Sequence, residues 1–269
     1  MTAPCVLLTG ASGGIGLALC DALGALGARV WLLGRSEERL QAAAARLGEA
    51  GGEPRPMTAD LGERGAAAEV ATRVLAEGSG LDWAIQNAGI VETAPVGSAA
   101  ADDSHARRLM QVNFHAPREL TQRLLPGLEA STRGQVLFVA SSAALGGAPY
   151  VAGYAASKHA LLGWARCAAL DLRGRVGGQA LCPHFVDSPM TDAGARFVAD
   201  RTGRSLEAVK EEYARLNPSG TLVTPAEVAS AALQLLQGER TGRVLELPGG
   251  GERVVVEPGI APPASNPPK

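Results

Sequence analysis

The sequence predicts a single α/β domain: a doubly wound parallel sheet of about seven strands, with helices on both faces and a small helical substrate lobe. First, short apolar runs alternate with longer amphipathic segments along the chain, an order typical of parallel strands joined by helices. Second, the runs are apolar almost throughout, as in strands covered on both faces. Third, no linker or internal repeat divides the 269 residues, which are enough for a large buried core.

The predicted strands are nearly continuous apolar runs, and the segments between them have helical patterns. Residues 36–47 mix Glu and Arg with alanines, as a solvent-facing helix does. Thr224-Pro225-Ala226-Glu227 is typical of a capping box with proline at the first helical position, and it predicts a helix to about Gln237. One apolar helical face is formed by Ile15, Leu19, Ala22, Leu23 and Leu26. Strands are expected at residues 5–9, 30–33, 81–86, 136–140, 179–182 and 244–247, with a weaker candidate at 55–58.

One segment interrupts the strand–helix alternation. Residues 193–200 and 205–216 have helical patterns without a strand between them. We therefore expect one dinucleotide-binding domain over residues 1–257, in which a lobe at about 187–220 covers the substrate. The Pro-rich residues 258–269 are expected to form a flexible tail.

Composition and charge argue against several classes of function. A formal net charge of −2, without blocks of like charge, argues against a nucleic-acid or anionic-membrane partner. The N-terminus has no basic stretch typical of a signal peptide, and no apolar run approaches the length of a membrane span. The four cysteines follow no metal-ligand spacing and are expected as free thiols. We therefore expect a cytoplasmic protein without a metal site.

A glycine-rich turn lies between the first predicted strand and the first predicted helix. It reads Thr9-Gly10-Ala11-Ser12-Gly13-Gly14-Ile15-Gly16. Glycines let the backbone approach a pyrophosphate, which binds where the free N–H groups and the dipole of a helix N-terminus favour an anion. Such a turn can also be purely structural, but its place between a strand and a helix favours dinucleotide binding in a Rossmann-type fold.

Several motifs, taken in order, resemble those of the short-chain dehydrogenase/reductase family over roughly residues 4 to 250. The glycine-rich turn matches the cofactor loop of that family, Thr-Gly-x-x-x-Gly-x-Gly. Gln86-Asn87-Ala88-Gly89 is similar to its Asn-Asn-Ala-Gly motif, with Gln86 in place of the first Asn. Asp60-Leu61 resembles the family's acidic position that contacts the adenine.

The resemblance also implies a catalytic set that contains Tyr154, Lys158 and Asn113. Tyr154 and Lys158 are four residues apart and so lie on one face of the predicted helix. A nearby ammonium stabilises the phenolate and lowers the pKa of a tyrosine, which ordinarily lies near ~10. By family analogy Tyr154 is the general acid and base, Lys158 lowers its pKa and binds the nicotinamide ribose, and Asn113 helps relay protons through water. A packed tyrosine beside a snorkelling lysine is the structural alternative.

The catalytic serine is Ser141 or Ser142. Both residues end the predicted strand at 136–140, as the serine of the family does. Ser142 lies 12 residues before Tyr154, one residue closer than the family's spacing, which would select Ser141. We take Ser142, on the assumption that one residue is missing from the loop at 146–150.

The end of the second predicted strand bears on the cofactor. An enzyme that uses NAD typically has Asp or Glu there to bind the ribose 2′-hydroxyl. Here Gly34 occupies that position and is followed by Arg35, whose guanidinium can pair with a 2′-phosphate. The family's second basic marker is absent because Gly13 occupies its position. NADP(H) is therefore favoured over NAD(H), although Arg35 can also be a solvated residue at the start of a helix.

Residues 183–190 depart from the family pattern Pro-Gly-x-Val-x-Thr. His184 replaces the glycine beside the nicotinamide, and Ser188 replaces the threonine that holds its carboxamide. His184 either lines the substrate pocket or is a local packing change. The complete cofactor-binding set that we expect is Gly10, Ser12, Gly14, Ile15, Gly16, Arg35, Asp60, Leu61, Asn87, Ala88, Gly89, Tyr154, Lys158, Pro183, Val186 and Ser188.

The resemblance implies an oxidoreductase that transfers a hydride between NADP(H) and a carbonyl or secondary alcohol. A non-redox family member, such as an epimerase, and a cofactor-sensing partner protein remain alternatives. The apolar residues of the lobe suit a hydrophobic substrate, whereas Arg196, Arg201, Arg204 and Lys210 suit an acidic or coenzyme A-linked one. By analogy the chain forms a homodimer or homotetramer partly through the helix of Tyr154, where Ala155, Ala156, Ala160 and Gly163 permit close packing.

Overall fold

A computed structural model describes residues 2–78, 80–97, 103–239 and 242–256. The tail predicted at 258–269 lies outside these residues. One sheet runs through the molecule with the strand order β3-β2-β1-β4-β5-β6-β7-β8. Its first seven strands pair in parallel, which confirms the predicted α/β fold. The strands are β1 (Cys5–Thr9), β2 (Arg29–Gly34), β3 (Glu53–Thr58), β4 (Trp83–Gln86), β5 (Gln135–Val139), β6 (Gly177–Pro183), β7 (Val244–Gly249) and β8 (Glu252–Val256).

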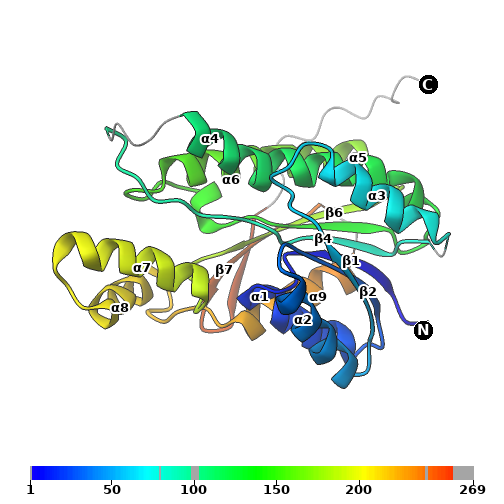
Figure 1. The fold of residues 1–269 in the computed structure, drawn as a ribbon, viewed down its shortest axis with the longest axis horizontal. Helices are drawn as coiled ribbons and strands as arrows, with labels where there is room; N and C mark the ends of the chain where they lie inside the picture. Colours follow the sequence, from blue (N-terminus) through cyan, green and yellow to red (C-terminus); the bar gives the residue numbers. More distant parts are fainter. Residues whose placement is uncertain (1, 79, 98–102, 240–241, 257–269) are drawn as a thin grey trace.

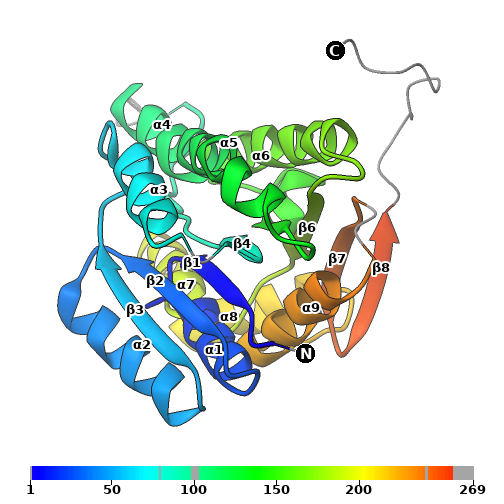
Figure 2. The ribbon, with the colours of Figure 1, turned by 90° about the vertical axis from the view of Figure 1, so that its right-hand side faces the viewer.

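Helices cover both faces of the sheet, as Figures 1 and 2 show. On one face, apolar side chains of α1, α2 and α9 pack on β1, β2 and β4 in one buried cluster. On the other face, α3, α5 and α6 pack on the same sheet in a second cluster. These six helices, together with α4, have the following bounds: α1 (Gly14–Gly24), α2 (Glu37–Glu49), α3 (Ala66–Ala76), α4 (Asp103–Met110), α5 (Ala116–Glu129), α6 (Ala152–Asp171) and α9 (Pro225–Gln237).

Local signals for the helix starts were correct in two places. Ser36 caps α2 by accepting a hydrogen bond from the Arg39 N–H, and so begins the helix where the charged pattern begins. Thr224 and Glu227 form the predicted capping box of α9, with Pro225 in the first turn. Both caps satisfy N–H groups that would otherwise lack a partner at the helix end.

The eighth strand was not predicted from the sequence. β8 pairs antiparallel with β7 and becomes the edge of the sheet. Gly249, Gly250 and Gly251 make the reversal possible, because all three have positive φ, a conformation that favours glycine. The apolar run near the C-terminus therefore forms a hairpin with β7 and extends the sheet beyond its seven parallel strands.

The predicted lobe is present beside the carboxyl end of the sheet. It contains α7 (Pro189–Thr202) and α8 (Leu206–Leu216), which lie apart from the main helical layers in Figure 1. The two helices enclose a small buried cluster of Ala195, Ala199 and Val209. A single parallel bridge between Val186 and Val223 closes the base of the lobe, where the chain leaves and rejoins the domain. Within the described residues, no helix is both long enough and apolar enough to span a membrane.

Candidate active site

The glycine-rich turn is fixed by buried polar side chains of the neighbouring strands. The hydroxyl of Thr9 is buried, donates to the carbonyl of Ile85 at 3.3 Å and accepts from the N–H groups of Asn87 and Ala88, each at 2.9 Å. The Asn87 amide donates in turn to the carbonyls of Thr9 and Gly10, at 3.0 and 3.1 Å. These bonds join the ends of β1 and β4, where the order of the sheet reverses and a ligand crevice is expected.

Two glycines of the turn are required by space. A Cβ on Gly16 would lie 2.2 Å from the carbonyl oxygen of Gly10, which no side chain permits. Gly10 has a φ of 67°, and a Cβ there would lie 2.9 Å from the backbone of Ala88. The backbone of the turn is therefore closely packed inside the protein, and its outer side is left open to the cavity described next.

A cavity of about 650 Å³ opens over the glycine-rich turn. It is lined by the ends of β1, β2 and β4, by the start of α1 and by the start of α7. Twelve of the sixteen predicted cofactor-binding residues line it: Gly10, Ser12, Gly14, Ile15, Gly16, Arg35, Asp60, Leu61, Asn87, Ala88, Gly89 and Ser188. Tyr154, Lys158, Pro183 and Val186 do not line this cavity.

Two residues that bound the cavity, Arg39 and Met190, were not in the predicted cofactor-binding set. Arg39, on the first turn of α2, lines the cavity beside Arg35 and donates to the carbonyl of Ser12 at 2.8 Å. This position brings a second positive charge next to the glycine-rich turn, where Gly13 leaves the sequence without one. At the other end, Met190 of α7 adds apolar surface.

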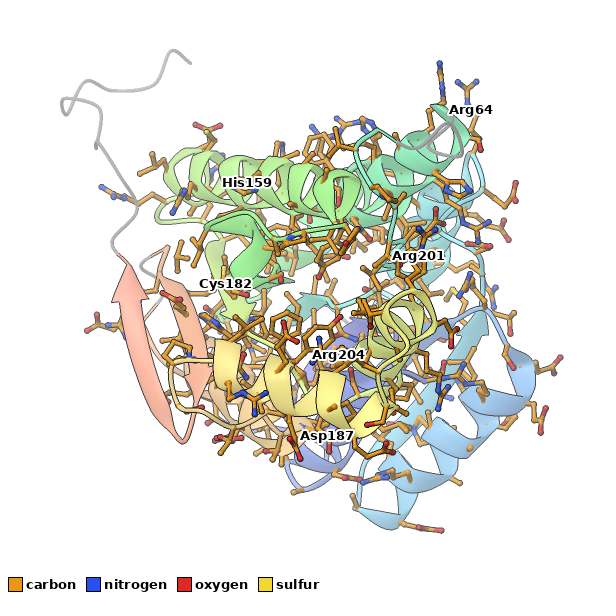
Figure 3. The ribbon with its side chains drawn as sticks, turned by 90° about the vertical axis from the view of Figure 1, so that its left-hand side faces the viewer. Arg64, His159, Cys182, Asp187, Arg201 and Arg204 are labelled. Atoms are coloured by element: carbon orange, nitrogen blue, oxygen red, sulfur yellow. The ribbon has the colours of Figure 1, made fainter. Side chains whose placement is uncertain are left out.

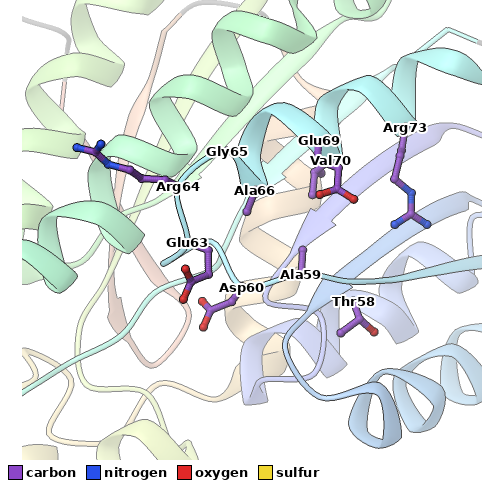
Figure 4. A pocket seen from close by; sticks show the side chains of 10 residues that line it. All are labelled: Thr58, Ala59, Asp60, Glu63, Arg64, Gly65, Ala66, Glu69, Val70 and Arg73. Atoms are coloured by element: carbon purple, nitrogen blue, oxygen red, sulfur yellow. The ribbon is translucent and has the colours of Figure 1, made fainter.

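A second hollow of about 390 Å³ lies beside the cavity on the side of α3 (Figure 4). Ala59 and Asp60 line both spaces. The carboxylate of Asp60 accepts the N–H of Gly62 at 2.8 Å, which holds the turn after β3. Charged side chains of both signs line the hollow, including Glu63, Arg64 and Arg73. Among the described residues, no three His, Cys, Asp or Glu side chains are grouped closely enough to hold a metal ion.

Tyr154 lies on the first turn of α6 and is half-buried. Burial raises the pKa of Tyr154 above its usual value, and a hydrogen bond with the side chain of Ser141 opposes the rise. The partner is thus Ser141, whereas Ser142 begins the short helical turn Ser142–Ala144 and is not that partner. The fold thus places Ser141, and not the Ser142 chosen from the sequence, against the phenol of Tyr154.

Lys158 lies one turn after Tyr154 and is buried, with 4% of its surface exposed. Its Nζ donates to the carbonyl of Val139 at 2.9 Å and lies 5.8 Å from the centroid of the Tyr154 ring. Burial lowers the pKa of Lys158 to about 8. The expected lowering of the Tyr154 pKa by Lys158 is therefore not found here, since the ammonium is directed at the backbone and desolvation of the phenol dominates.

Asn113 lies in a π-helical turn, Gln111–His115, between α4 and α5. Its side chain is fully buried and fully bonded: Oδ1 accepts the Ile90 N–H, and Nδ2 donates to the Ile90 carbonyl and to Ser157 Oγ, each at 2.9 Å. Ser157 donates to the carbonyl of Tyr154 at 2.7 Å. The side chain of Asn113 thus connects the loop after β4 to α6. Such turns are frequent at functional sites.

Gly89 connects the buried polar groups with the cavity. It lines the cavity, and a Cβ at this position would lie 3.4 Å from both Lys158 Nζ and Asn113 Oδ1. The backbone of Gly89 therefore separates the cavity from Lys158 and Asn113 by a single layer of atoms. Tyr154, Lys158, Asn113 and Ser141 come from three different elements and are brought together only by the fold.

His184, which the sequence left open between two roles, follows β6 and is half-buried. Its Nε2 lies 2.6 Å from Glu246 Oε1 on β7, the neighbouring strand. Pro183, before it, is the last residue of β6, and Val186, after it, makes the bridge to Val223. The side chain of His184 thus links the end of β6 to β7.

Three functional candidates were missed in the sequence. Ser157 links Asn113 to α6, Arg39 adds charge to the cavity, and Cys182 lies close enough to Ser141 and Lys158 for both to affect its pKa, which burial raises to about 11. Ser157 stands directly before Lys158 in the sequence, which is the one local signal for it. Arg39 and Cys182 have no local signal, because only the packing of α2 and β6 brings them to the site.

Comparison with known proteins agrees with this geometry. A family model described as short chain dehydrogenase matches residues 4–196. A 3β-hydroxysteroid dehydrogenase of Mediterraneibacter gnavus is 29% identical over 262 residues, which cover 91% of this chain and 93% of that protein. A D-β-hydroxybutyrate dehydrogenase of Cupriavidus necator is 28% identical over 233 residues, with 85% and 89% covered.

A similar solved structure is that of a variant of actinorhodin polyketide ketoreductase with NADPH. It is 29% identical, has a TM-score of 0.82 and covers 93% of this chain and 97% of its own. The chain belongs to the short-chain dehydrogenase family and is an oxidoreductase of that family.

Proposed function

We propose that the chain transfers a hydride between a nicotinamide cofactor, NADP(H) in preference to NAD(H), and the carbonyl or secondary alcohol of a small molecule. The observation that carries this proposal is the half-buried Tyr154–Ser141 pair beside Lys158, next to a cavity that the glycine-rich turn lines. The bound cofactor would supply or accept the hydride. The side chains of this chain would hold the substrate oxygen and exchange its proton.

In this proposal Tyr154 exchanges the oxygen-bound proton at its Oη. The raised pKa of Tyr154 keeps the phenol protonated at neutral pH, which suits donation of a proton to a carbonyl during reduction. Ser141, as the hydrogen-bond partner of that phenol, is placed to orient the same substrate oxygen. We therefore assign the catalytic serine to Ser141 instead of Ser142.

Lys158 and Asn113 support the tyrosine in different ways. The Nζ of Lys158 donates to the carbonyl of Val139 and lies next to Gly89, so its remaining protons would be available to a cofactor ribose bound beside Gly89. The side chain of Asn113 has all its donors occupied by Ile90 and Ser157. A proton relay at Asn113 would therefore use backbone carbonyls of the π-helical turn, and its side chain would fix the shape of that turn.

The preference for NADP(H) rests on two arginines at one end of the cavity. Arg35 and Arg39 are both exposed, and neither makes an ion pair with a carboxylate in the described part of the chain. A side chain on Gly34 would meet Leu40 at 3.1 Å and Ser12 Oγ at 3.2 Å, which leaves little room for the acidic residue of an NAD site. Two guanidinium groups that pair with no carboxylate in the described residues suit a 2′-phosphate. The related ketoreductase was solved with NADPH.

We also propose that the chain self-associates through the outer face of α6. Ala156, Gly163 and His159 are exposed there, and no atom lies within 4 Å of a Cβ placed on Gly163 (His159 is labelled in Figure 3). Ala155, in contrast, is buried inside the domain and cannot take part. A face of small side chains would let a second copy of the helix approach closely. Light scattering of the purified protein would give the mass of the assembly.

The cofactor proposal is tested by fluorescence titration of the purified protein with NADPH and with NADH. Tighter binding of NADPH is expected, by roughly tenfold or more if two charge-assisted contacts to the phosphate are made. Arg35→Ala and Arg39→Ala should each weaken NADPH binding and leave NADH binding unchanged. Equal affinity for NADPH and NADH would contradict the proposed role of the two arginines and leave the proposed hydride transfer standing. Binding of neither cofactor would contradict the proposed function.

A further inference from the structure

Tyr150, four residues before Tyr154, has a strained backbone. Its φ is 65°, and within the described ranges it is the only residue other than glycine with a positive φ. A bulky side chain is rarely found in this left-handed region, and such strain is retained mainly at functional sites. The carbonyl of Tyr150 accepts the N–H of Ala94 at 2.8 Å, which joins the loop before α6 to the loop after β4. The strained turn thus holds Tyr150 at the carboxyl edge of the sheet.

The ring of Tyr150 contacts the lobe. It packs edge-on against Phe197 of α7, with ring centroids 6.4 Å apart and an angle of 64°. The guanidinium of Arg201 lies 4.5 Å from the centroid of the Phe197 ring on its own helix (Arg201 is labelled in Figure 3). Tyr150 nevertheless keeps 42% of its surface exposed. The two rings therefore connect the domain to the lobe and leave aromatic surface open beside the start of α6.

Most of the large exposed apolar side chains of the described residues follow strands at the same edge of the sheet as Tyr150. Five large apolar residues are exposed in the part of the chain that the structure describes. Four of them lie in segments that follow β4, β5 or β6, and hence at the carboxyl edge of the sheet: Val96 (84% exposed), Leu145 (37%), Tyr150 (42%) and Met190 (41%). The fifth, Leu216, ends α8. The carboxyl edge of a parallel sheet is where folds of this class bind their ligands.

The cations of the lobe are mostly occupied by other groups. Lys210 pairs with Asp192 at 2.7 Å and with Asp187 at 3.1 Å. Arg204 pairs with Glu212 on α8, and Arg201 lies over the Phe197 ring. Three of the four basic residues that could have selected an acidic or coenzyme A-linked substrate are thus engaged within the lobe. This favours an apolar substrate over an anionic one.

We infer that Tyr150 and Phe197 form an outer substrate subsite that takes the apolar ring system attached to the reacting carbonyl. The substrate class is a ketone, or the matching secondary alcohol, in which the reacting ring is fused to a further apolar ring. The carbonyl would reach Tyr154 at the start of α6 while the fused ring lies on the open surface of Tyr150. This inference rests on the proposed function, because it specifies the substrate of the same site.

The experiment compares two ketones that differ by one fused ring, cyclohexanone and 2-tetralone, with NADPH as reductant. The wild-type protein should reduce 2-tetralone with a kcat/KM at least about tenfold higher, because the second ring is removed from water on the aromatic pair. Tyr150→Asn should remove most of that preference through KM. Asn tolerates a positive φ, so this variant removes the ring and keeps the turn.

Three control variants separate the effect of the Tyr150 ring from an effect of the backbone turn and from a general loss of activity. Tyr150→Phe keeps the ring and should keep the preference for 2-tetralone over cyclohexanone. Phe197→Ala should lower the preference for 2-tetralone in the same direction as Tyr150→Asn. Leu216→Ala removes an exposed apolar side chain of the same lobe at the far end of α8, and it should leave kcat/KM for both ketones unchanged.

Equal kcat/KM for the two ketones in the wild type, or equal losses on both in Tyr150→Asn, would overturn the inference. Failure of the proposed function looks different: either Tyr154→Phe keeps its full activity, or no ketone oxidises NADPH. In the latter case, saturation-transfer NMR with 2-tetralone on the NADPH-loaded protein still tests the subsite. Contact of the fused ring with the wild type that is lost in Tyr150→Asn would support it, and contact that survives in Tyr150→Asn would contradict it.

Discussion

The cofactor loop and the lobe lie at the same edge of the sheet, but different interactions hold them. The cofactor loop is fixed by buried hydrogen bonds of Thr9 and Asn87 and by glycines that leave no space for a Cβ. The lobe has a buried cluster of only three small residues, and partly exposed ion pairs such as Lys210–Asp192 join its helices. Elements with few buried contacts open at lower free energy than a core does. A rigid loop beside a movable lobe suits an enzyme that holds one ligand in a fixed place and admits another.

The largest effect on activity is expected for Tyr154→Phe, which tests the proposed proton transfer. Removal of the hydroxyl should lower kcat by roughly 10²- to 10⁴-fold, because it takes away the proton donor. Binding of NADPH should be unchanged, since Tyr154 does not line the cofactor cavity. Steady-state kinetics and fluorescence titration of the same preparation measure the two quantities.

Tyr213→Phe is the matched control in the lobe, where Tyr213 stacks on Phe185 at 4.4 Å. It removes a hydroxyl from a tyrosine outside the proposed chemistry and should keep most of the activity. Ser141→Ala should lower kcat in the same direction as Tyr154→Phe, and Ser142→Ala should do so less. Similar kcat for Tyr154→Phe and Tyr213→Phe would contradict the assigned role of Tyr154.

The second effect is expected for Gly16→Ala, which tests the packing of the cofactor loop. The new Cβ would lie 2.2 Å from the Gly10 oxygen, so the turn must shift. The free energy of unfolding should fall by about 2–3 kcal/mol, and NADPH binding should be lost. Gly48→Ala, on exposed α2 with no atom within 4 Å of its Cβ, should be neutral or stabilising by up to about 1 kcal/mol. Chemical denaturation of the two variants gives the comparison, and equal stabilities would show that the turn can relax.

The third effect concerns Lys158, whose buried charge costs stability in the cofactor-free protein. Its pKa is about 8 in the folded protein against 10.5 for an ordinary lysine, so the unfolded chain binds more protons between these values. The free energy of unfolding should therefore rise with pH across this window, and the penalty is present in full below pH 8. Lys158→Met should stabilise the protein at pH 7 by on the order of 2 kcal/mol, and this gain should disappear by about pH 10.5.

Thermal unfolding at pH 7 and pH 10 measures this difference between Lys158→Met and the wild type. Activity should be lost in the same variant, because stability and function oppose each other at this residue. Lys210→Met, at a lysine outside the active site, should show no such gain at pH 7. A Lys158→Met protein that is less stable than the wild type at both pH values would show that the bond to Val139 outweighs the burial of the charge.

The smallest effect is expected for Lys210→Met in the lobe. Hydrogen bonds to Asp192 and then Asp187 raise the pKa of Lys210, so it is charged at neutral pH and joins α8 to the start of α7. Because the pair is partly exposed, its loss should cost at most about 1 kcal/mol. Hydrogen exchange of α7 and α8 should become faster, while exchange in β1 and α1 stays unchanged. High salt should likewise speed the hydrogen exchange of α7 and α8 in the wild type. An equal increase of exchange in α7 and α8 and in β1 and α1 would contradict the difference in stability between the lobe and the cofactor loop.

The sequence by itself determined those features that depend on residues close together along the chain. Apolar runs predicted six of the seven parallel strands, because a strand covered on both faces is apolar throughout, whereas the largely exposed β3 gave only a weak signal. The caps at Ser36 and Thr224 and the spacing of Tyr154 and Lys158 are also local. Each of these features follows from the periodicity of the backbone or from a few consecutive side chains, and each could be predicted without knowledge of the packing.

The tertiary structure alone decided the features that depend on distant residues. It placed Ser141 against the phenol of Tyr154, directed Lys158 to the carbonyl of Val139 and placed Arg39 beside the glycine-rich turn. It also paired β8 with β7 across Gly249, Gly250 and Gly251, which mark a turn locally but do not say which strand the following run joins. In each case the outcome depends on a shift of one residue along the chain or of a few ångströms in the position of a side chain. Such distances are set by how helices pack on the sheet, and they are not encoded in any single stretch of residues.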